Sequence, residues 1–261
     1  MPRLVAFDLD DTLAPSKSPL DPRMGDLLAQ LLGLVEVCVI SGGQFEQFRT
    51  QVVERLPALD DAQAARLHLM PTCGTQYWRR TRSEGTEGWS QVYAENLTDD
   101  QKQRVLTVLE TQARKLGLWE AETWGPILED RGSQITFSAL GQAAPVAAKR
   151  AWDPTGERKS ALRAAVAALV PDLEVRSGGS TSVDVTRQGI DKAYGMRKLA
   201  EVTGIPLDDM LFVGDRLDPD GNDYPVKALG VRTHAVSGWT QTADYLETFI
   251  ADLRAGLVAE A

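Results

Sequence analysis

The stretch Leu4-Val5-Ala6-Phe7-Asp8-Leu9-Asp10-Asp11-Thr12-Leu13 decides the fold class of this chain. Its first four residues form an apolar run that is typical of a strand buried in a parallel sheet. Asp8 and Asp10 follow two residues apart, and residues at that spacing in a strand point to the same side. In open α/β sheets, ligands bind at the carboxyl ends of the strands. The stretch therefore predicts a polar site where the first strand ends.

The two neighbouring carboxylates also predict a bound cation. Like charges repel at short range, and burying them is costly unless a cation or a proton offsets them. A hard divalent cation such as Mg²⁺, which prefers oxygen ligands, meets that requirement. An acidic turn is the alternative, because Asp-x-Asp alone is common, and further segments have to decide between the two.

Strands and helices alternate in the first third of the chain. Buried strands are predicted at Val35–Ile40 and Leu67–Met70, and Asp21-Pro22 opens a helix between the first two strands. This order favours a parallel sheet covered by helices. The last third resumes the pattern with the apolar run Met210–Val213, which Gly214-Asp215 follows.

The middle of the chain has a different character. A capping-box sequence at Thr98 starts one helix, and a second helix is predicted over about Glu157 to Leu169. Short strands of alternating polarity accompany them. We therefore predict an α/β fold with a Rossmann-like parallel-sheet core, residues 1–81 and 187–261, and an inserted α+β cap domain over residues 82–186.

The composition excludes several classes of protein. The chain has 261 residues, of which 43% are hydrophobic, so it can bury a sizeable core. Its net charge of -9 argues against a nucleic-acid-binding surface. The first strand begins by Leu4, and no apolar run approaches the ~20 residues of a membrane span. We expect a cytoplasmic protein that binds neither nucleic acids nor membranes.

Three further segments carry polar residues to the same sheet edge. Ser41-Gly42-Gly43 follows a predicted strand and precedes a helix, where a hydroxyl and backbone N–H groups near a helix N-terminus suit an anion. Lys192 stands just before the helix that resumes the core. Gly214-Asp215 ends a buried strand, and Asn222-Asp223 lies in the acidic loop beyond it. Each segment alone has an ordinary explanation as a turn or a solvated side chain.

Together with the opening stretch, these segments resemble the four motifs of the haloacid dehalogenase superfamily, in the same order. The insertion between the second and third motifs resembles the C2-type cap of subfamily IIB. The resemblance covers nearly the whole chain. Two stretches, 178–192 and 214–223, are similar to eukaryotic-type phosphomannomutases.

The resemblance implies a phosphoryl-transfer site. Asp8 would be the nucleophile that forms an aspartyl-phosphate, and Asp10 would be the general acid and base. Lys192 and Ser41 would hold oxygens of the transferring phosphoryl group, with the backbone of Gly42-Gly43 completing the anion cradle.

The resemblance also implies bound Mg²⁺. Its ligands would come from Asp8, the backbone carbonyl of Asp10, Asp215 and Asp223. Asn222, together with Asp223, would orient the catalytic lysine and a metal-bound water.

In the cap, the resemblance implies contacts to the substrate. Ser182 and Asp184 correspond to residues that contact the sugar, and Arg131 corresponds to an arginine that holds a second phosphate. Gln142 stands where the phosphomannomutases have another arginine. Its amide can donate a hydrogen bond but brings no charge, although Lys149-Arg150 lies nearby in the sequence.

We therefore expect a Mg²⁺-dependent phosphatase that acts on small phosphorylated sugars or related metabolites through an aspartyl-phosphate. The alternative is a phosphomannomutase-like phosphotransferase that interconverts hexose 1- and 6-phosphates. The analogy with the mutases adds the expectation of a homodimer formed through the cap. A non-catalytic phosphosugar sensor is a third hypothesis, which Asp8 and Asp10 disfavour because a pure binder needs neither a nucleophile nor an acid/base.

Overall fold

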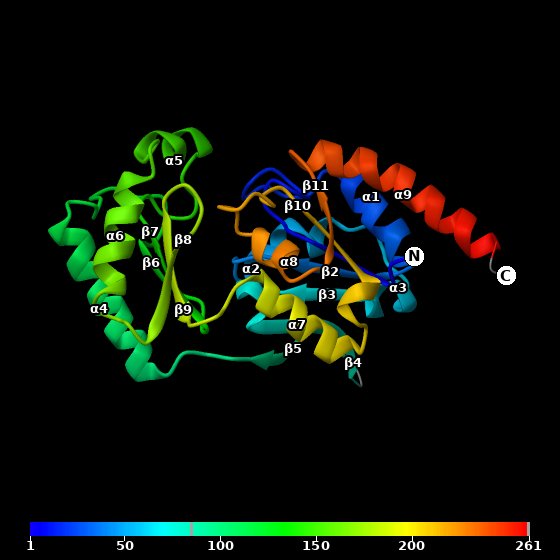
Figure 1. Ribbon diagram of the computed structural model, residues 1–261, viewed down its shortest axis with the longest axis horizontal. Helices are drawn as coiled ribbons and strands as arrows, with labels where there is room; N and C mark the ends of the chain where they lie inside the picture. Colours follow the sequence, from blue (N-terminus) through cyan, green and yellow to red (C-terminus); the bar gives the residue numbers. More distant parts are fainter. Residues whose placement is uncertain (84–85, 260–261) are drawn as a thin grey trace. The chain divides into compact units, whose positions relative to one another are not determined.

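The computed structural model describes residues 1–83 and 86–259 and divides the chain into two compact units. The core unit comprises Met1–Tyr93 and Asp191–Ala261, and the inserted unit comprises Ala94–Ile190. Figure 1 labels the helices and strands of both units.

A seven-stranded sheet forms the centre of the core unit, in the order β11-β10-β1-β2-β3-β4-β5. β1 pairs in parallel with β2 and β10, β2 with β3, and β10 with β11, whereas β4 runs antiparallel to β3. The predicted parallel α/β core is confirmed. The strands are β1 (Leu4–Phe7), β2 (Glu36–Ile40), β3 (Leu67–Met70), β4 (Gln76–Ser83), β5 (Thr86–Ala94), β10 (Met210–Gly214) and β11 (Arg232–Ala235).

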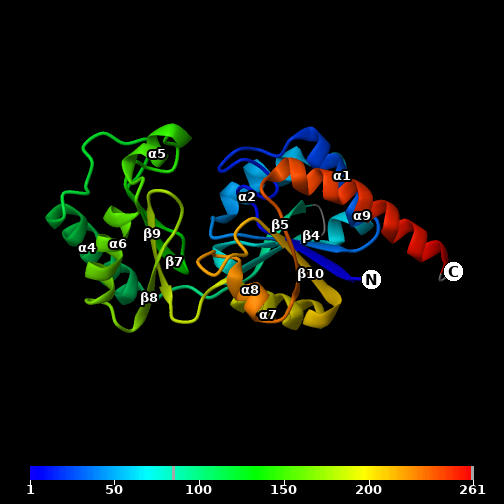
Figure 2. The ribbon, with the colours of Figure 1, turned by 45° about the horizontal axis from the view of Figure 1, so that its top comes forward.

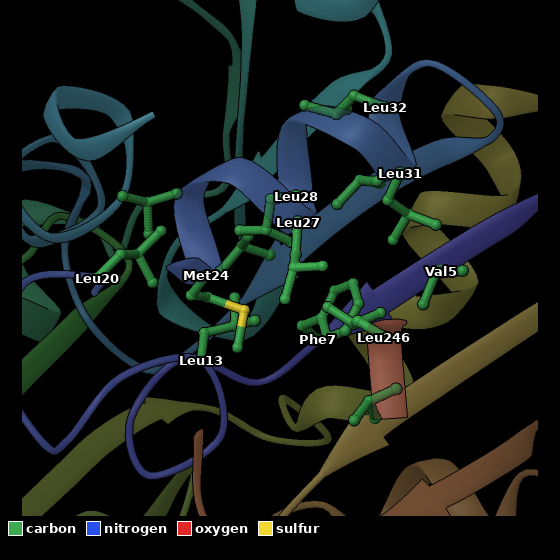
Figure 3. Packing of buried hydrophobic residues seen from close by; sticks show 14 of the residues in the cluster. Val5, Phe7, Leu13, Leu20, Met24, Leu27, Leu28, Leu31, Leu32 and Leu246 are labelled. Carbon is green, nitrogen blue, oxygen red and sulfur yellow. The ribbon is translucent and has the colours of Figure 1, made fainter. Parts of the chain in front are cut away.

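Helices cover both faces of this sheet, as Figure 2 shows for α1 and α9 on one face and α7 and α8 on the other. β1 contributes to both interfaces because successive strand residues point to opposite faces. Val5 and Phe7 pack with α1 and with Leu246 of α9 (Figure 3), whereas Leu4 and Ala6 join a second buried cluster with side chains of α7. The helices are α1 (Pro22–Leu32), α2 (Phe45–Gln51), α3 (Asp61–Ala65), α7 (Lys192–Thr203), α8 (Tyr224–Ala228) and α9 (Trp239–Ala259), with 3₁₀ turns η1 (Val53–Arg55), η2 (Thr72–Gly74) and η3 (Leu207–Asp209).

The unit boundaries differ from those predicted after residues 81 and 186. β4 and β5 extend the core sheet beyond β3, with Arg79 opposite His68 and Trp78 opposite Leu69. The core unit therefore continues to Tyr93 and resumes at Asp191. Alternation along a strand predicts which face is buried but does not identify the sheet that the strand joins.

The inserted unit has a four-stranded antiparallel sheet in the order β6-β7-β9-β8. α4 begins after Thr98, whose side chain accepts a hydrogen bond from the backbone of Gln101 in the predicted capping box. Apolar residues of α4 and α6, among them Leu109 and Val166, form one buried cluster with the strands. The elements are α4 (Asp99–Lys115), β6 (Leu128–Asp130), β7 (Gln134–Ser138), α5 (Val146–Trp152), α6 (Glu157–Ala167), β8 (Leu173–Ser177) and β9 (Ser182–Arg187). Across the part of the chain that the structure describes, no helix is both long and apolar enough to span a membrane.

Candidate active site

The carboxyl end of β1 brings a nucleophilic carboxylate next to a buried lysine. Asp8 directly follows β1, and its backbone N–H donates to the carbonyl of Val213 in β10 (3.0 Å). Lys192 is the first residue of α7, and its Nζ lies 2.6 Å from Oδ1 of Asp8. The same Nζ donates to Oδ1 of Asp223. Lys192 is only 1% exposed, and both carboxylates are buried as well.

The lysine is buried because α7 approaches the core very closely. Asp191 caps the helix through its side chain, so α7 begins at Lys192. One turn later, a Cβ on Gly195 would lie 2.2 Å from Cδ1 of Ile40 and 2.7 Å from the carbonyl oxygen of Cys73. Only glycine permits this approach, which carries the start of α7 to the carboxylates.

The loop after β10 supplies the other carboxylates. Asp223 uses its second oxygen, Oδ2, to accept the backbone N–H of Arg216 (3.1 Å). A Cβ on Gly214 would lie 2.4 Å from this oxygen, so glycine is required at the end of the strand. Asp215 accepts a hydrogen bond from Oγ1 of Thr12 (3.2 Å), which ties the loop after β10 to the loop after β1.

The site holds more negative than positive charge. Burial raises the pKa of Asp8, and the carboxylates of Asp223 and Asp215 raise it further against the opposing effect of Lys192. Burial also raises the pKa of Asp215, again with a contribution from Asp223. Burial opposes the charge on Lys192, but Asp223 and Asp8 hold the pKa of Lys192 above its ordinary value. Three carboxylates thus face a single ammonium group.

The donor set fits a divalent cation. One oxygen from each of Asp8, Asp215 and Asp223 can be chosen so that all three lie within 4.8 Å of one another. Ligands on opposite sides of Mg²⁺ are roughly 4.2 Å apart, so a small adjustment brings the three oxygens around one ion. The excess of carboxylates over the one ammonium group, and the set of oxygen donors, agree with the predicted Mg²⁺.

The group of three carboxylates found among the described residues does not include the side chain of Asp10. Its Oδ1 accepts the backbone N–H of Lys17 (2.7 Å), and its Oδ2 accepts Nζ of Lys17 (2.7 Å) and Nε2 of Gln47 (3.1 Å). Burial raises the pKa of Asp10, but these donors outweigh it and hold the pKa below its ordinary value. Lys17 and Gln47 were not predicted as partners of Asp10, because one lysine in a polar loop and one glutamine on a helix form no pattern.

The predicted anion cradle lies at the same sheet edge. Because β1 and β2 are parallel with Phe7 opposite Val39, the residues that follow each strand leave the sheet together. Ser41 is buried, its carbonyl accepts the backbone N–H of Cys73 (3.0 Å), and its Oγ accepts that of Gly43 (3.4 Å). These contacts hold the turn between β2 and α2 in a fixed conformation.

The predicted substrate residues of the inserted unit lie on the polar face of its sheet. On β9, Asp184 is opposite Thr136 and Ser182 is opposite Ser138. Asp184 accepts a hydrogen bond from Oγ1 of Thr136 (2.7 Å). Gln142 donates its Nε2 to Oγ of Ser138 (3.1 Å), so its amide is part of the same hydrogen-bonded surface.

Charged side chains on this surface are of both signs. Nη2 of Arg131 lies 2.6 Å from Oε2 of Glu129, and this pair is partly buried. Arg176 lies opposite Asp184 and forms an ion pair with Glu174 (3.3 Å). Arg131 and Arg176 therefore each have a glutamate of this sheet as a neighbour.

The structure brings together four of the predicted core residues and leaves one at the surface. Those that meet are Asp8, Asp215, Asp223 and Lys192. Asn222 is exposed, whereas its neighbour Asp223 contacts the lysine, as Asp8 does.

A model of the eukaryotic phosphomannomutase family matches residues 24–251. The chain belongs to the eukaryotic phosphomannomutase family. Phosphomannomutase 1 of Mus musculus is 23% identical over 230 residues, which cover 86% of this chain and 83% of that protein. The phosphomannomutase of Schizosaccharomyces pombe is 22% identical over 229 residues, which cover 85% and 84% of the two chains. The predicted phosphomannomutase-like resemblance is confirmed.

Solved structures show the same fold for this phosphomannomutase-family chain. An IMP-nucleotidase from Plasmodium falciparum superposes with a TM-score of 0.69 at 16% identity, covering 97% of this chain and 71% of that one. A haloacid dehalogenase-like hydrolase from Bacteroides thetaiotaomicron gives a TM-score of 0.60 at 14% identity, covering 95% and 100%. The match to the phosphomannomutase family model, together with this shared fold, confirms the predicted haloacid dehalogenase superfamily, and the phosphomannomutase relatives support an enzyme of that superfamily.

Proposed function

We propose that the chain is a Mg²⁺-dependent phosphohydrolase that releases phosphate from small phosphorylated sugars or related metabolites. The observation that carries this proposal is the buried contact between Asp8 and Lys192 beside two further carboxylates. An ammonium group 2.6 Å from the Asp8 carboxylate fixes one of its oxygens, so the other can face a phosphorus atom. The same ammonium group has three N–H donors and can also bind a phosphoryl oxygen.

Asp8, Asp215 and Asp223, with the backbone carbonyl of Asp10, are the residues that would hold Mg²⁺. When bound, the ion offsets the repulsion between the anionic nucleophile and the anionic phosphate. The site needs that charge, since one lysine faces three carboxylates.

The reaction would proceed in two displacements at one phosphorus atom. The donors to Asp10 favour its ionised form, so it first takes up a proton from solvent. An oxygen of Asp8 then bonds to phosphorus as the ester P–O bond breaks, and Asp10 gives that proton to the leaving alkoxide. Water then attacks the phosphorus of the aspartyl-phosphate and gives a proton to Asp10, and Asp8 leaves as a carboxylate. Lys192 and the hydroxyl of Ser41 would bind the equatorial phosphoryl oxygens, where charge is spread in the transition state.

Water is favoured as the acceptor by the polar face of the inserted unit. A mutase has to hold a second phosphate while the first is transferred, and planar arginine forks suit that task. Here position 142 is glutamine, and Arg131 and Arg176 are each next to a glutamate of their own sheet. This chemistry suits a substrate with one phosphate and a neutral, hydroxylated remainder that Ser182 and Asp184 would contact.

A phosphomannomutase-like phosphotransferase is the second candidate, and two observations favour it. The family model matches most of the chain. In addition, Nζ of Lys149 donates to the backbone carbonyl of Gln142 (2.7 Å), so a cation lies next to the position that lacks an arginine. The expected homodimer through the inserted unit belongs to this candidate.

The deciding experiment measures phosphate release and isomer interconversion together. The substrates are mannose and glucose 1- and 6-phosphates with Mg²⁺, each with and without a hexose bisphosphate. Phosphate release without interconversion is the expected result. Interconversion that requires the bisphosphate would support the mutase instead, and no phosphate release from any of a broad phosphosugar panel would overturn the hydrolase proposal.

A further inference from the structure

Two side chains outside the four motifs form a closed hydrogen-bonded triangle with Asp10. Lys17 serves both oxygens of Asp10, its backbone N–H donating to Oδ1 and its Nζ to Oδ2, each at 2.7 Å. Gln47 joins the other two residues, since its Nε2 donates to Oδ2 of Asp10 (3.1 Å) and its Oε1 accepts Nζ of Lys17 (2.8 Å). Every corner of the triangle is thus bonded to the other two.

The backbone is arranged to permit these contacts. Lys17 has a φ of 58°, a left-handed backbone conformation that is unfavourable for residues other than glycine. A Cβ on Gly43 would lie 2.1 Å from Oε1 of Gln47, so the glutamine passes directly over this glycine. Gly43, which belongs to the predicted anion cradle, therefore also leaves room for the glutamine that binds Asp10.

We propose that Lys17 and Gln47 are positioning residues that hold the Asp10 carboxylate in the orientation from which it exchanges a proton with substrate and water. The inference rests on the proposed function. An aspartate side chain has two rotatable bonds, and proton transfer requires it within hydrogen-bond reach of the reacting oxygen. Three donors bind the two carboxylate oxygens of Asp10 and leave that carboxylate little freedom to rotate. Removal of the Lys17 ammonium group takes away its contacts with Asp10 and Gln47, so only the backbone N–H of Lys17 and the amide of Gln47 still bind the carboxylate.

The test compares substrates whose leaving groups differ in their need for a proton. A sugar phosphate expels an alkoxide, which requires an acid, whereas acetyl phosphate expels acetate, which does not. Single-turnover formation of the phosphoenzyme is measured with both in a rapid-quench instrument. A defect confined to the positioning of Asp10 lowers the first rate and spares the second, and a general structural defect lowers both.

The variants are chosen to change hydrogen bonds without changing size. Lys17→Met keeps the backbone donor but loses the ammonium, and Gln47→Glu keeps the acceptor for Lys17 but loses the donor to Asp10. Lys102→Met is the matched control, because it removes a lysine paired with Asp130 (3.1 Å) in the inserted unit. If Lys17→Met does not fold, Gln47→Glu tests the same claim.

We expect Lys17→Met to slow phosphorylation by a sugar phosphate about ten- to a hundredfold, part of the general-acid contribution, with less than about a threefold change for acetyl phosphate. Equal losses with both substrates, or no loss with either, would overturn the inference while leaving the hydrolase proposal in place. Failure of the unmodified enzyme to form a phosphoenzyme with either substrate would instead count against the proposed function.

Discussion

The candidate active site of the core unit and the polar face of the inserted unit differ in how they use charge. In the core, Lys192 and Asp223 are fully buried and contact each other directly. On the inserted sheet, hydrogen bonds between neutral groups, as between Gln142 and Ser138, lie beside arginine–glutamate pairs that balance each other's charge. A buried cluster with excess negative charge has a high electrostatic cost unless it binds a counter-charge, whereas a surface whose charges are paired and whose other groups are neutral can be altered at less cost.

This difference separates the part of the molecule that sets the chemistry from the part that sets the substrate. The charges at the end of β1 suit phosphoryl transfer to and from a carboxylate, whatever the rest of the substrate is. The groups on the inserted sheet suit recognition of hydroxyls and of a second phosphate. We therefore expect core substitutions to affect every substrate and those of the inserted sheet to affect some substrates only.

The largest effect is expected from removal of the nucleophile. Asp8→Asn should lower turnover by at least about 10³-fold with every phosphate ester and with acetyl phosphate, because no aspartyl-phosphate can form. Asp184→Asn, its counterpart on the inserted sheet, should raise KM for sugar phosphates and retain phosphorylation by acetyl phosphate. Steady-state kinetics with both substrate types separate the two. Equal losses from the two substitutions would contradict the division, and retained turnover in Asp8→Asn would exclude this nucleophile.

The next effect concerns stability. Lys192→Met leaves buried carboxylates without their ammonium partner, so we expect the free energy of unfolding to fall by about 3–5 kcal/mol in the absence of Mg²⁺. Lys198→Met is the control, since that lysine lies on the same helix and pairs with Glu201 at the surface (3.4 Å). Urea denaturation, followed with and without Mg²⁺, measures both. A loss no larger than that of the control would show that the buried pair is not important for folding.

The candidate active site of the core unit could be predicted only in part from the sequence. The motif residues Asp8 and Lys192 could be brought together because parallel strands end at one edge, where the helices that follow them begin. The burial of Lys192 could not be predicted, since it depends on the contact of Gly195 with Ile40 and the Cys73 carbonyl. Such contacts join segments far apart in the chain and leave no periodic pattern.

Neither the hydrogen-bond partners of Asp10 nor the unit boundary could be predicted from the sequence, for related reasons. Lys17 and Gln47 reach Asp10 through side-chain orientations that a sequence does not encode in spacing. The boundary at Tyr93 follows from the pairing of β4 with β3. An alternating sequence does not show which of the two sheets such a strand joins.

A smaller effect is expected where the inserted unit lacks an arginine. Gln142→Arg adds a charged, bidentate donor, and we expect it to tighten the binding of a hexose bisphosphate about tenfold, as one added charged hydrogen bond would. Inhibition of phosphate release by the bisphosphate measures the change, with Gln142→Lys testing whether charge alone suffices. An unchanged inhibition constant for both variants would show that position 142 does not contact a second phosphate.

The proposed mechanism depends most on the covalent role of Asp8, which can be measured with the phosphoenzyme itself. The enzyme is quenched in acid during turnover of acetyl phosphate with Mg²⁺, digested, and analysed by mass spectrometry for a phosphorylated peptide. We predict one phosphoryl group on Asp8 that hydroxylamine removes, as it does from acyl phosphates, and no such group in Asp8→Asn. A phosphoryl group on any other residue, or none in an enzyme that is turning over, would contradict the account.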